Sequence, residues 1–241
     1  MAMIVAMDGP SGAGKSTLAK ALARRLGFLY LDTGALFRAV ALLAARGELD
    51  PSREADRQAL AHRLSRTTIR MTPTPEGNRL LLDGEDVSEA IRTPQVSRLA
   101  SQVAALPFVR KAVLEIERTI LAEGDVVLEG RDTTTVVAPD ADVKFFVTAS
   151  PEIRGERRFE ELRAKGLDVT LEETTREMRE RDLQDRTRPD APLKRAKDAV
   201  EIDTSNRSVP ELVAEMIEIV ERKRHEGSCK DRGNNLQPIV T

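Results

Sequence analysis

A phosphate-binding loop near the amino terminus constrains this chain more than any other feature. Residues 9–16, Gly-Pro-Ser-Gly-Ala-Gly-Lys-Ser, fit the pattern G-x-x-x-x-G-K-[ST] between an apolar strand candidate, Met3 to Met7, and a helical pattern that begins near Lys15. The glycines let backbone N–H groups surround a phosphate, Lys15 reaches the β- and γ-phosphates, and Ser16 can ligate Mg²⁺. The motif therefore predicts a site for a nucleoside triphosphate and its metal ion. The residues predicted to hold the triphosphate are Gly9, Pro10, Ser11, Gly12, Ala13, Gly14, Lys15, Ser16 and Thr17.

Composition limits what surrounds this loop. The chain has 241 residues, of which 40% are hydrophobic, so it can bury one substantial core and a small insert. Its formal charge of −2 and its 3% aromatic content give no case for binding nucleic acid. Cys229 is the only cysteine, no run of about 18 apolar residues could cross a membrane, and the amino terminus leads into a strand rather than a signal sequence. We therefore expect a cytoplasmic, disulfide-free monomer that binds small-molecule nucleotides and has no nucleic-acid or membrane partner.

Short apolar runs alternate with longer amphipathic stretches, which is the pattern of a parallel sheet covered by helices. The apolar runs are nearly continuous, as in strands that are buried on both faces. The first helix is expected to end at Gly27, a candidate left-handed cap, and its regularly spaced leucines are assigned to the core. The sequence thus predicts an α/β fold with a P-loop core of five parallel strands flanked by helices. The strand candidates are Met3–Met7, Phe28–Leu31, Val126–Glu129, Val143–Val147 and Val200–Ile202.

Three segments depart from this alternation. Residues 66–86 contain two short apolar runs around a turn at Pro73 to Gly77, which predicts a small antiparallel insert, and a long helical region with a break at Pro107 follows. Residues 152–190 contain nine arginines among many acids, and a solvated helix pair would account for them. Residues 225–241 are polar and show no periodicity, so they are predicted to form a disordered tail.

Polar side chains after two of the predicted strands are the next candidates for a site. Asp32 and Thr33 follow the second strand, where open α/β sheets bind ligands, although Thr33 could instead cap the next helix. Arg38 is the only charge in an apolar helical run, so either a structural acid or a bound anion is needed beside it. Arg131 and Asp132 follow the third strand, and an Arg–Asp pair at this edge beside a phosphate-binding loop predicts a role in the site.

Motifs over nearly the whole chain resemble those of the bacterial cytidylate kinases, a family of P-loop nucleoside monophosphate kinases. The chain has neither a plain Walker B ending nor an Asn-Lys-x-Asp guanine-recognition motif, which argues against a GTPase switch or a mechanical ATPase. The resemblance runs from about Ile4 to Lys223. The matching segments are the phosphate-binding loop, Leu31-Asp32-Thr33-Gly34-Ala35 with Arg38, Ser101-Gln102-Val103-Ala104, Pro107 to Arg110, Glu129-Gly130-Arg131-Asp132, Pro139-Asp140-Ala141, and the stretch from Arg181-Asp182 through Asp185 and Arg188 to Ala191-Pro192-Leu193.

The resemblance implies transfer of the γ-phosphoryl group of ATP, with Mg²⁺, to CMP or dCMP. It also implies three parts within residues 1–224: a core, a nucleoside-monophosphate-binding insert at about 66–86, and an arginine-rich helical lid at about 152–190. A phosphate acceptor has a second pKa near 6 and needs no general base, whereas an alcohol acceptor would need a carboxylate base. The alternatives are a similar kinase acting on UMP, AMP or a non-nucleotide alcohol, and a non-catalytic nucleotide-sensing module.

The resemblance further assigns roles to single residues. It places Lys15 and Ser16 at ATP·Mg²⁺, with Arg157 and Arg158 as donor contacts at the start of the lid. It places Arg38 and Arg131 at the acceptor phosphate. Around the cytosine it implies Thr33, Arg110, Asp132 and Arg188, and facing the ribose it implies Ser101, Arg181 and Asp185. The catalytic cations that it implies are Lys15, Arg131, Arg181 and Arg188.

One position departs from the family pattern, which usually reads Gly-Arg-Asp-x-Gly-Thr after the third strand. Here Thr134 stands in place of the glycine. If that backbone needs a positive φ, a β-branched residue is strained by about 1 kcal/mol or more. The loop that carries Asp132 is therefore expected to differ from the family pattern.

Overall fold

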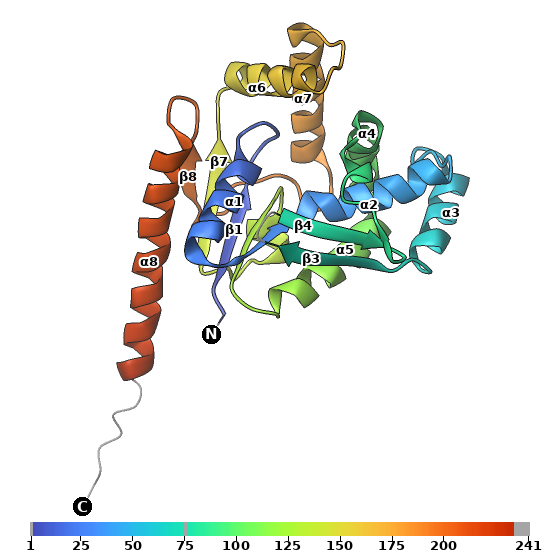
Figure 1. Ribbon diagram of the computed structural model, residues 1–241. Coiled ribbons are helices and arrows are strands. Elements are labelled where there is room, and N and C mark those ends of the chain that lie inside the picture. The colour runs from blue at the N-terminus through green and yellow to red at the C-terminus, as the bar shows by residue number, and fades with distance from the viewer. Residues whose placement is uncertain (1, 75–76, 234–241) are drawn as a thin grey trace, which may run out of the picture.

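A five-stranded parallel sheet forms the centre of the molecule (Figure 1). The computed structural model describes residues 2–74 and 77–233. The strands lie in the order β2-β6-β1-β7-β8, and every neighbouring pair runs parallel. The predicted α/β class and all five predicted strands are confirmed, with ends that shift slightly. The strands are β1 (Ile4–Asp8), β2 (Leu29–Asp32), β6 (Val126–Gly130), β7 (Val143–Thr148) and β8 (Val200–Asp203).

Helices cover both faces of the sheet because alternate strand residues point to opposite sides. In β1, Val5 and Met7 pack into a cluster of buried side chains with α1 and α8. Ala6, between them, packs into a second cluster with α2, α3, α4 and α5. The sheet is thus the middle layer of three. These helices are α1 (Lys15–Leu26), α2 (Thr33–Arg46), α3 (Glu54–Leu64), α4 (Pro94–Val103), α5 (Pro107–Leu121) and α8 (Val209–Gly233).

Local sequence signals account for several helix boundaries. Gly27 ends α1 in the left-handed conformation with φ of 71°, as its position after the leucine pattern predicts. Pro107 is the first residue of α5, where its missing N–H leaves no bond unmade, so the predicted break is confirmed. The cap of α2 is Asp32, whose carboxylate accepts a hydrogen bond from Ala35 N at 3.1 Å. Thr33 is therefore the first helical residue and not the cap.

The predicted antiparallel insert is a three-stranded sheet against the β2 edge of the core. It consists of β3 (Ile69–Thr74), β4 (Gly77–Leu82) and β5 (Glu85–Asp86), with Ile69 opposite Leu82. Residues 75–76 of the predicted turn lie outside the described residues. Asn78 of β4 attaches the insert to β2: its amide donates to Tyr30 O at 2.6 Å and accepts from Asp32 N at 2.9 Å. A short 3₁₀ turn, Ala90–Arg92, leads from the insert to α4.

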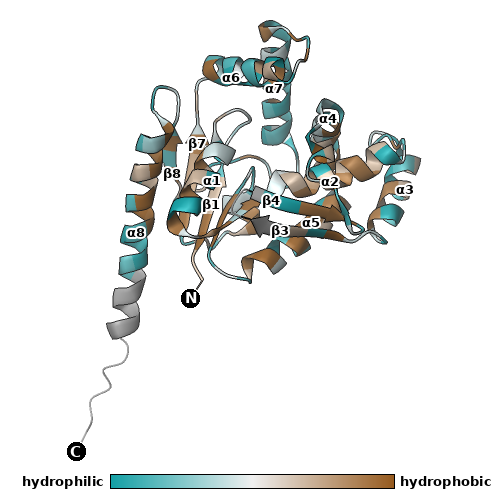
Figure 2. Ribbon diagram, viewed as in Figure 1, coloured by the Kyte–Doolittle hydropathy of each residue, from teal (hydrophilic) through white to brown (hydrophobic). Residues whose placement is uncertain are grey.

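The arginine-rich segment forms two packed helices, α6 (Pro151–Ala164) and α7 (Leu171–Thr187), which project beyond the carboxyl edge of the sheet (Figure 1). Figure 2 shows α7 as largely hydrophilic, in contrast to the brown strands of the core. At the other end of the chain, α8 continues through residues 225–233 of the predicted tail, and residues 234–241 lie outside the described residues. Within the described ranges, no helix combines the length and apolarity that a membrane span requires.

A cationic cavity at the carboxyl edge of the sheet

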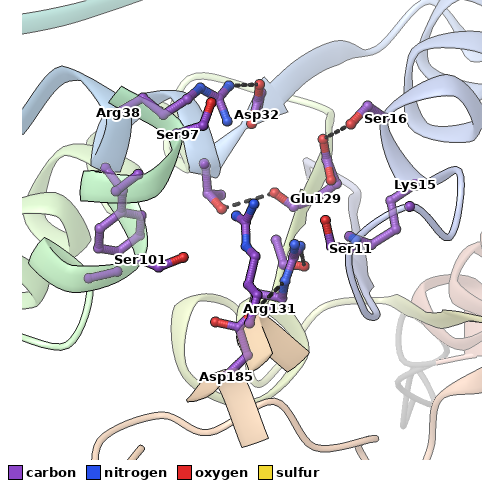
Figure 3. Close-up of a pocket in the computed structure, with 18 of the residues that line it drawn as sticks. Ser11, Lys15, Ser16, Asp32, Arg38, Ser97, Ser101, Glu129, Arg131 and Asp185 are labelled. Carbon is purple, nitrogen blue, oxygen red and sulfur yellow. Dashed lines mark hydrogen bonds and ion pairs between the residues drawn. The ribbon is translucent and has the colours of Figure 1, made fainter. Parts of the chain in front are cut away.

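A cavity of about 560 Å³ lies where the phosphate-binding loop, the start of α2, α4, the end of β6 and the helices α6 and α7 meet. Figure 3 shows the labelled side chains of Lys15 and Ser16 on one side, those of Arg38 and Ser101 on the other, and Glu129 and Arg131 between them. Most of the predicted site residues are therefore brought together. Those that line the cavity are Ser11, Gly12, Gly14, Lys15, Ser16, Thr17, Thr33, Arg38, Ser101, Arg131, Asp132, Arg157, Arg158, Arg181, Asp185 and Arg188; Gly9, Pro10, Ala13 and Arg110 do not.

The phosphate-binding loop has the backbone that its glycines predict. Gly9 has φ of 152°, and a Cβ there would lie 1.9 Å from Val147 O, so only glycine fits. Lys15 donates a hydrogen bond from Nζ to Pro10 O at 2.8 Å. Burial, reinforced by the positive charges of Arg131 and Arg181, lowers the pKa of Lys15 to about 7. The loop thus surrounds a cation whose charge is poorly neutralised by the protein itself.

Glu129 is a site residue to which the sequence reasoning gave no role. Its carboxylate accepts hydrogen bonds from Ser16 Oγ at 2.5 Å and from Tyr30 Oη at 3.1 Å. Burial and the negative charge of Glu129 raise the pKa of Tyr30, so the phenol keeps its proton and remains a donor. Glu129 is paired in register with Met7 of β1, two residues before the loop. Because Glu129 ends a predicted strand of the same parallel sheet, the sequence could have indicated that it lies near Ser16.

Arg38 has both an acid beside it and access to the cavity. Its Nη2 lies 2.7 Å from Asp32 Oδ2, and the two side chains are 25% and 23% exposed. Asp32 therefore caps α2 with one oxygen and holds Arg38 with the other. Because Arg38 also lines the cavity, an anion there would meet a guanidinium that is already oriented.

Four charged side chains form a buried network around Asp132. Arg131 Nε donates to Asp185 Oδ2 at 3.0 Å, and Arg188 Nη2 donates to Asp132 Oδ1 at 3.4 Å. Arg110 donates to the other oxygen of Asp132 from behind the cavity wall. Burial raises the pKa of Asp132, although Arg110 and Arg188 act against that rise. One buried carboxylate is thus fixed in orientation by two arginines.

The aromatic ring of Phe37 supports this network. Phe37 lines the cavity from α2, and the guanidinium of Arg110 lies 5.6 Å from its ring centroid. This is the geometry of a cation–π contact. Phe37 was not among the predicted site residues. Its position one residue before Arg38 was the only signal in the sequence.

Arg181 is a second cation that the protein leaves poorly neutralised. Within the described part of the chain, its Nε is buried and has no hydrogen-bond partner. Burial, followed by the charge of Arg131, lowers the pKa of Arg181 to about 10. Together with the buried Lys15 and the half-buried Arg131, it forms a group of three cations that line one cavity. Such a group is suited to bind oxyanions that carry several negative charges.

The two predicted donor contacts of α6 both line the cavity, but their guanidinium groups already have partners. Arg157 donates to Thr204 Oγ1 at 2.9 Å and to Thr204 O at 2.7 Å. Arg158 pairs with Glu161 at 2.7 Å. Thr204 in turn donates to Ala13 O at 3.1 Å, which links Arg157 to the phosphate-binding loop.

Thr134 is accommodated without the strain that a positive φ would bring. The non-glycine residues with positive φ are Glu48, Asp83 and Ala191, so Thr134 is not one of them within residues 2–74 and 77–233. It lies in a π-helical turn, Thr133–Val137, where its N–H and its hydroxyl both donate to Asp8 Oδ2, at 2.8 and 2.6 Å. Thr133 makes the same two bonds to Asp8 Oδ1. The departure from the family pattern thus supplies a hydroxyl donor to a fully buried carboxylate.

Comparison with known proteins identifies close relatives. The family model described as Cytidylate kinase matches residues 5–222. A protein of Carboxydothermus hydrogenoformans named cytidylate kinase is 49% identical over 221 residues, which cover 92% of this chain and 98% of the relative. One of Geobacter sulfurreducens with the same name is 50% identical over 223 residues, covering 92% and 94%. A crystal structure of an uncharacterized protein from Eubacterium ventriosum has a TM-score of 0.50 at 12% identity, covering 91% of this chain and 98% of its own, and is similar in fold alone.

Proposed function

The chain belongs to the cytidylate kinase family, and we propose that it transfers the γ-phosphoryl group of ATP to CMP and dCMP in this cavity. It is a nucleoside monophosphate phosphotransferase with CMP as its acceptor. The observation that carries the assignment to this cavity is the group of three cations that line it, the buried Lys15 and the half-buried Arg131 and Arg181. Bringing two polyanionic nucleotides together requires positive charge at the point where they meet, and these side chains supply it.

Two carboxylates that line the cavity, Asp132 and Asp185, are poorly placed to act as a general base. Asp132 is bound by Arg110 and Arg188, and Asp185 is bound by Arg131. A carboxylate oxygen that already accepts a hydrogen bond from a guanidinium is not free to take a proton from an acceptor hydroxyl. A phosphate acceptor is largely dianionic at neutral pH and needs no base, whereas an alcohol would need one. This arrangement supports a nucleoside monophosphate rather than an alcohol as the acceptor.

We place the donor at the phosphate-binding loop, in residues 9–17. Lys15 would leave Pro10 O for the transferred phosphoryl group and offset the charge that develops there. Mg²⁺ prefers oxygen ligands and retains water and phosphate oxygens, and Ser16 Oγ and the Glu129 carboxylate, 2.5 Å apart, offer such a pair. When bound, the ion would neutralise charge on the donor phosphates. We propose that Arg157 and Arg158 contact the phosphates of ATP, for which Arg157 must leave Thr204 and Arg158 must leave Glu161.

We place the acceptor on the opposite side of the cavity. Arg38 and Arg131 would hold its phosphate, and Ser101, Arg181 and Asp185 would face its ribose. The cytosine would lie between Thr33, Asp132 and Arg188. Arg110 lies behind Asp132, so we propose that it acts on the base only through this carboxylate. The insert at 66–86 and the pair α6–α7 would then close on the acceptor and the donor, respectively.

A substrate panel tests this proposal. ATP and Mg²⁺ are supplied with CMP, dCMP, UMP, AMP or glycerol, and ADP formation is followed by a coupled assay. We expect CMP and dCMP to be phosphorylated with the highest kcat/KM, and Lys15→Ala protein serves as the control for contaminating kinases. Faster turnover of UMP, AMP or glycerol would refute the assignment.

We also propose a cytoplasmic monomer, because the cavity is built from one chain and its substrates are small metabolites. Light scattering tests whether the protein is a monomer.

A further inference from the structure

Two buried charges that take no part in the site described above connect α6 and α7 to the phosphate-binding loop. Arg154 of α6 and Asp182 of α7 form an ion pair at 2.5 Å, and their side chains are 8% and 12% exposed. Arg154 Nη1 also donates to Ser11 O at 3.0 Å, while Ser11 N donates to Asp182 Oδ1 at 3.4 Å. The pair therefore contacts both main-chain polar groups of one loop residue.

Packing at the next residue reinforces this attachment. A Cβ on Gly12 would lie 2.8 Å from Met178 Cε of α7 and 3.1 Å from Arg154 O of α6. Arg154 is further held to the core by a bond from its Nε to Ala149 O at 3.2 Å. Gly12 thus lies against both helices, so the tip of the loop and the bases of α6 and α7 form one contact.

The spacing along each helix places the proposed donor and phosphoryl contacts next to this attachment. Arg157 and Arg158 follow Arg154 by three and four residues and thus lie about one turn away on the same face of α6. Arg181 directly precedes Asp182 in α7. A small rotation of the two helices about the Arg154–Asp182 pair would therefore change the distance of all three arginines from the phosphates.

We propose that Arg154 and Asp182 are positioning residues that make the phosphate-binding loop the pivot of the α6–α7 pair. When polyphosphate binds to the loop and orders its backbone, the Arg154–Asp182 pair also orders α6 and α7. Their arginines then lie against the phosphates. A tether that only keeps the helices packed would leave them insensitive to what the loop binds. This inference rests on the proposed function, because it takes α6 and α7 as the elements that close over ATP.

Hydrogen exchange with tripolyphosphate as the probe separates these two roles. In the wild type we expect the probe to slow exchange both in residues 9–17 and in α6–α7. Asp182→Asn removes the charge with little change in volume. Arg154→Lys keeps a charge but loses the planar fork, in which Nε binds Ala149 O while Nη1 binds Ser11 O and Asp182. In both variants we expect loop protection to persist and the response of α6–α7 to fall at least about fivefold. The matched control is Glu215→Gln, which breaks an exposed pair with Arg207 outside the cavity and should change neither response.

Steady-state kinetics give the second readout. In both variants we expect kcat to fall by about tenfold or more while KM for CMP stays within about threefold, because the acceptor half is untouched. If either folded variant keeps the wild-type response of α6–α7 and the wild-type kcat, the pair is only a tether and the inference is wrong. If the wild type phosphorylates CMP but tripolyphosphate leaves its α6–α7 exchange unchanged, the inference fails and the proposed function stands. If the wild type does not phosphorylate CMP, the proposed function itself fails.

Discussion

Binding of ATP should draw a proton onto Lys15. In the ligand-free protein, burial and two neighbouring arginines lower the pKa of Lys15 to about 7, against about 10.4 for an exposed lysine. At pH 8 about 90% of the Lys15 side chains are then neutral. The triphosphate supplies negative charge beside Nζ and restores the pKa towards its ordinary value. We therefore expect uptake of about 0.9 proton per ATP at pH 8 and about 0.5 at pH 7.

The same reasoning fixes the sign of two pH dependences. Because the folded protein binds this proton more weakly than the unfolded chain, the contribution of Lys15 to the free energy of unfolding rises with pH between about 7 and 10. ATP affinity changes in the opposite direction, since binding must pay for protonation, and we expect Kd to rise up to about tenfold per pH unit above 7.

Calorimetry measures the proton directly. ATP is titrated into the protein at pH 8 in buffers of different ionisation enthalpy, and the slope of the observed enthalpy gives the protons taken up. The control is Lys15→Arg, because a guanidinium remains charged at pH 8 and should abolish the uptake. Equal proton uptake by the wild type and by Lys15→Arg would refute the reasoning and assign the proton to another group.

Three further predictions concern buried polar groups. Asp132→Asn should lower the ratio of kcat/KM for CMP to kcat/KM for UMP, mainly by lowering kcat/KM for CMP. A carboxylate accepts a hydrogen bond from the cytosine amino group, whereas an amide can also donate one to the uracil carbonyl. An unchanged ratio in folded protein would contradict recognition of the base by Asp132. Glu117 is 2% exposed, and burial, followed by the charge of Asp132, raises its pKa well above the ordinary value. The contribution of Glu117 to the free energy of unfolding therefore falls as pH rises above about 4.5. Glu117→Gln should therefore stabilise the protein more at pH 8 than at pH 5 in thermal melts, and an equal shift at both values would contradict the assignment. Thr134→Val should lower the free energy of unfolding, measured with denaturant, by about 2 kcal/mol, because Asp8 loses a hydroxyl donor. Thr134→Ser keeps the hydroxyl and should lower it much less. Equal losses in the two variants would show that the hydroxyl is not the cause.

Much of the fold was predictable because its signals are local. Apolar runs identify the five strands, Gly27 and Pro107 mark helix boundaries, and the glycine-rich loop requires a backbone that its own residues define. In a parallel sheet the carboxyl ends of all strands lie at one edge. Arg131 and Asp132 follow a strand, as the phosphate-binding loop does, so the sequence could assign them to the same edge as the loop. Of the two possibilities left open for Thr33, the helix cap is excluded because Asp32, one residue earlier, satisfies the helix end.

The sequence by itself determined the fold class, the phosphate-binding loop and, through its resemblance to a family, the reaction. The tertiary structure alone decided which polar and charged groups are paired with one another. Ser16 meets Glu129 across 113 positions, and Ser11 meets Asp182 across 171. No periodicity or propensity encodes such pairs, since each depends on how helices pack against the sheet and on how much water that packing removes. For the same reason only the structure distinguishes Arg38, which has an acid beside it, from Arg181, whose buried Nε has no partner within the described residues.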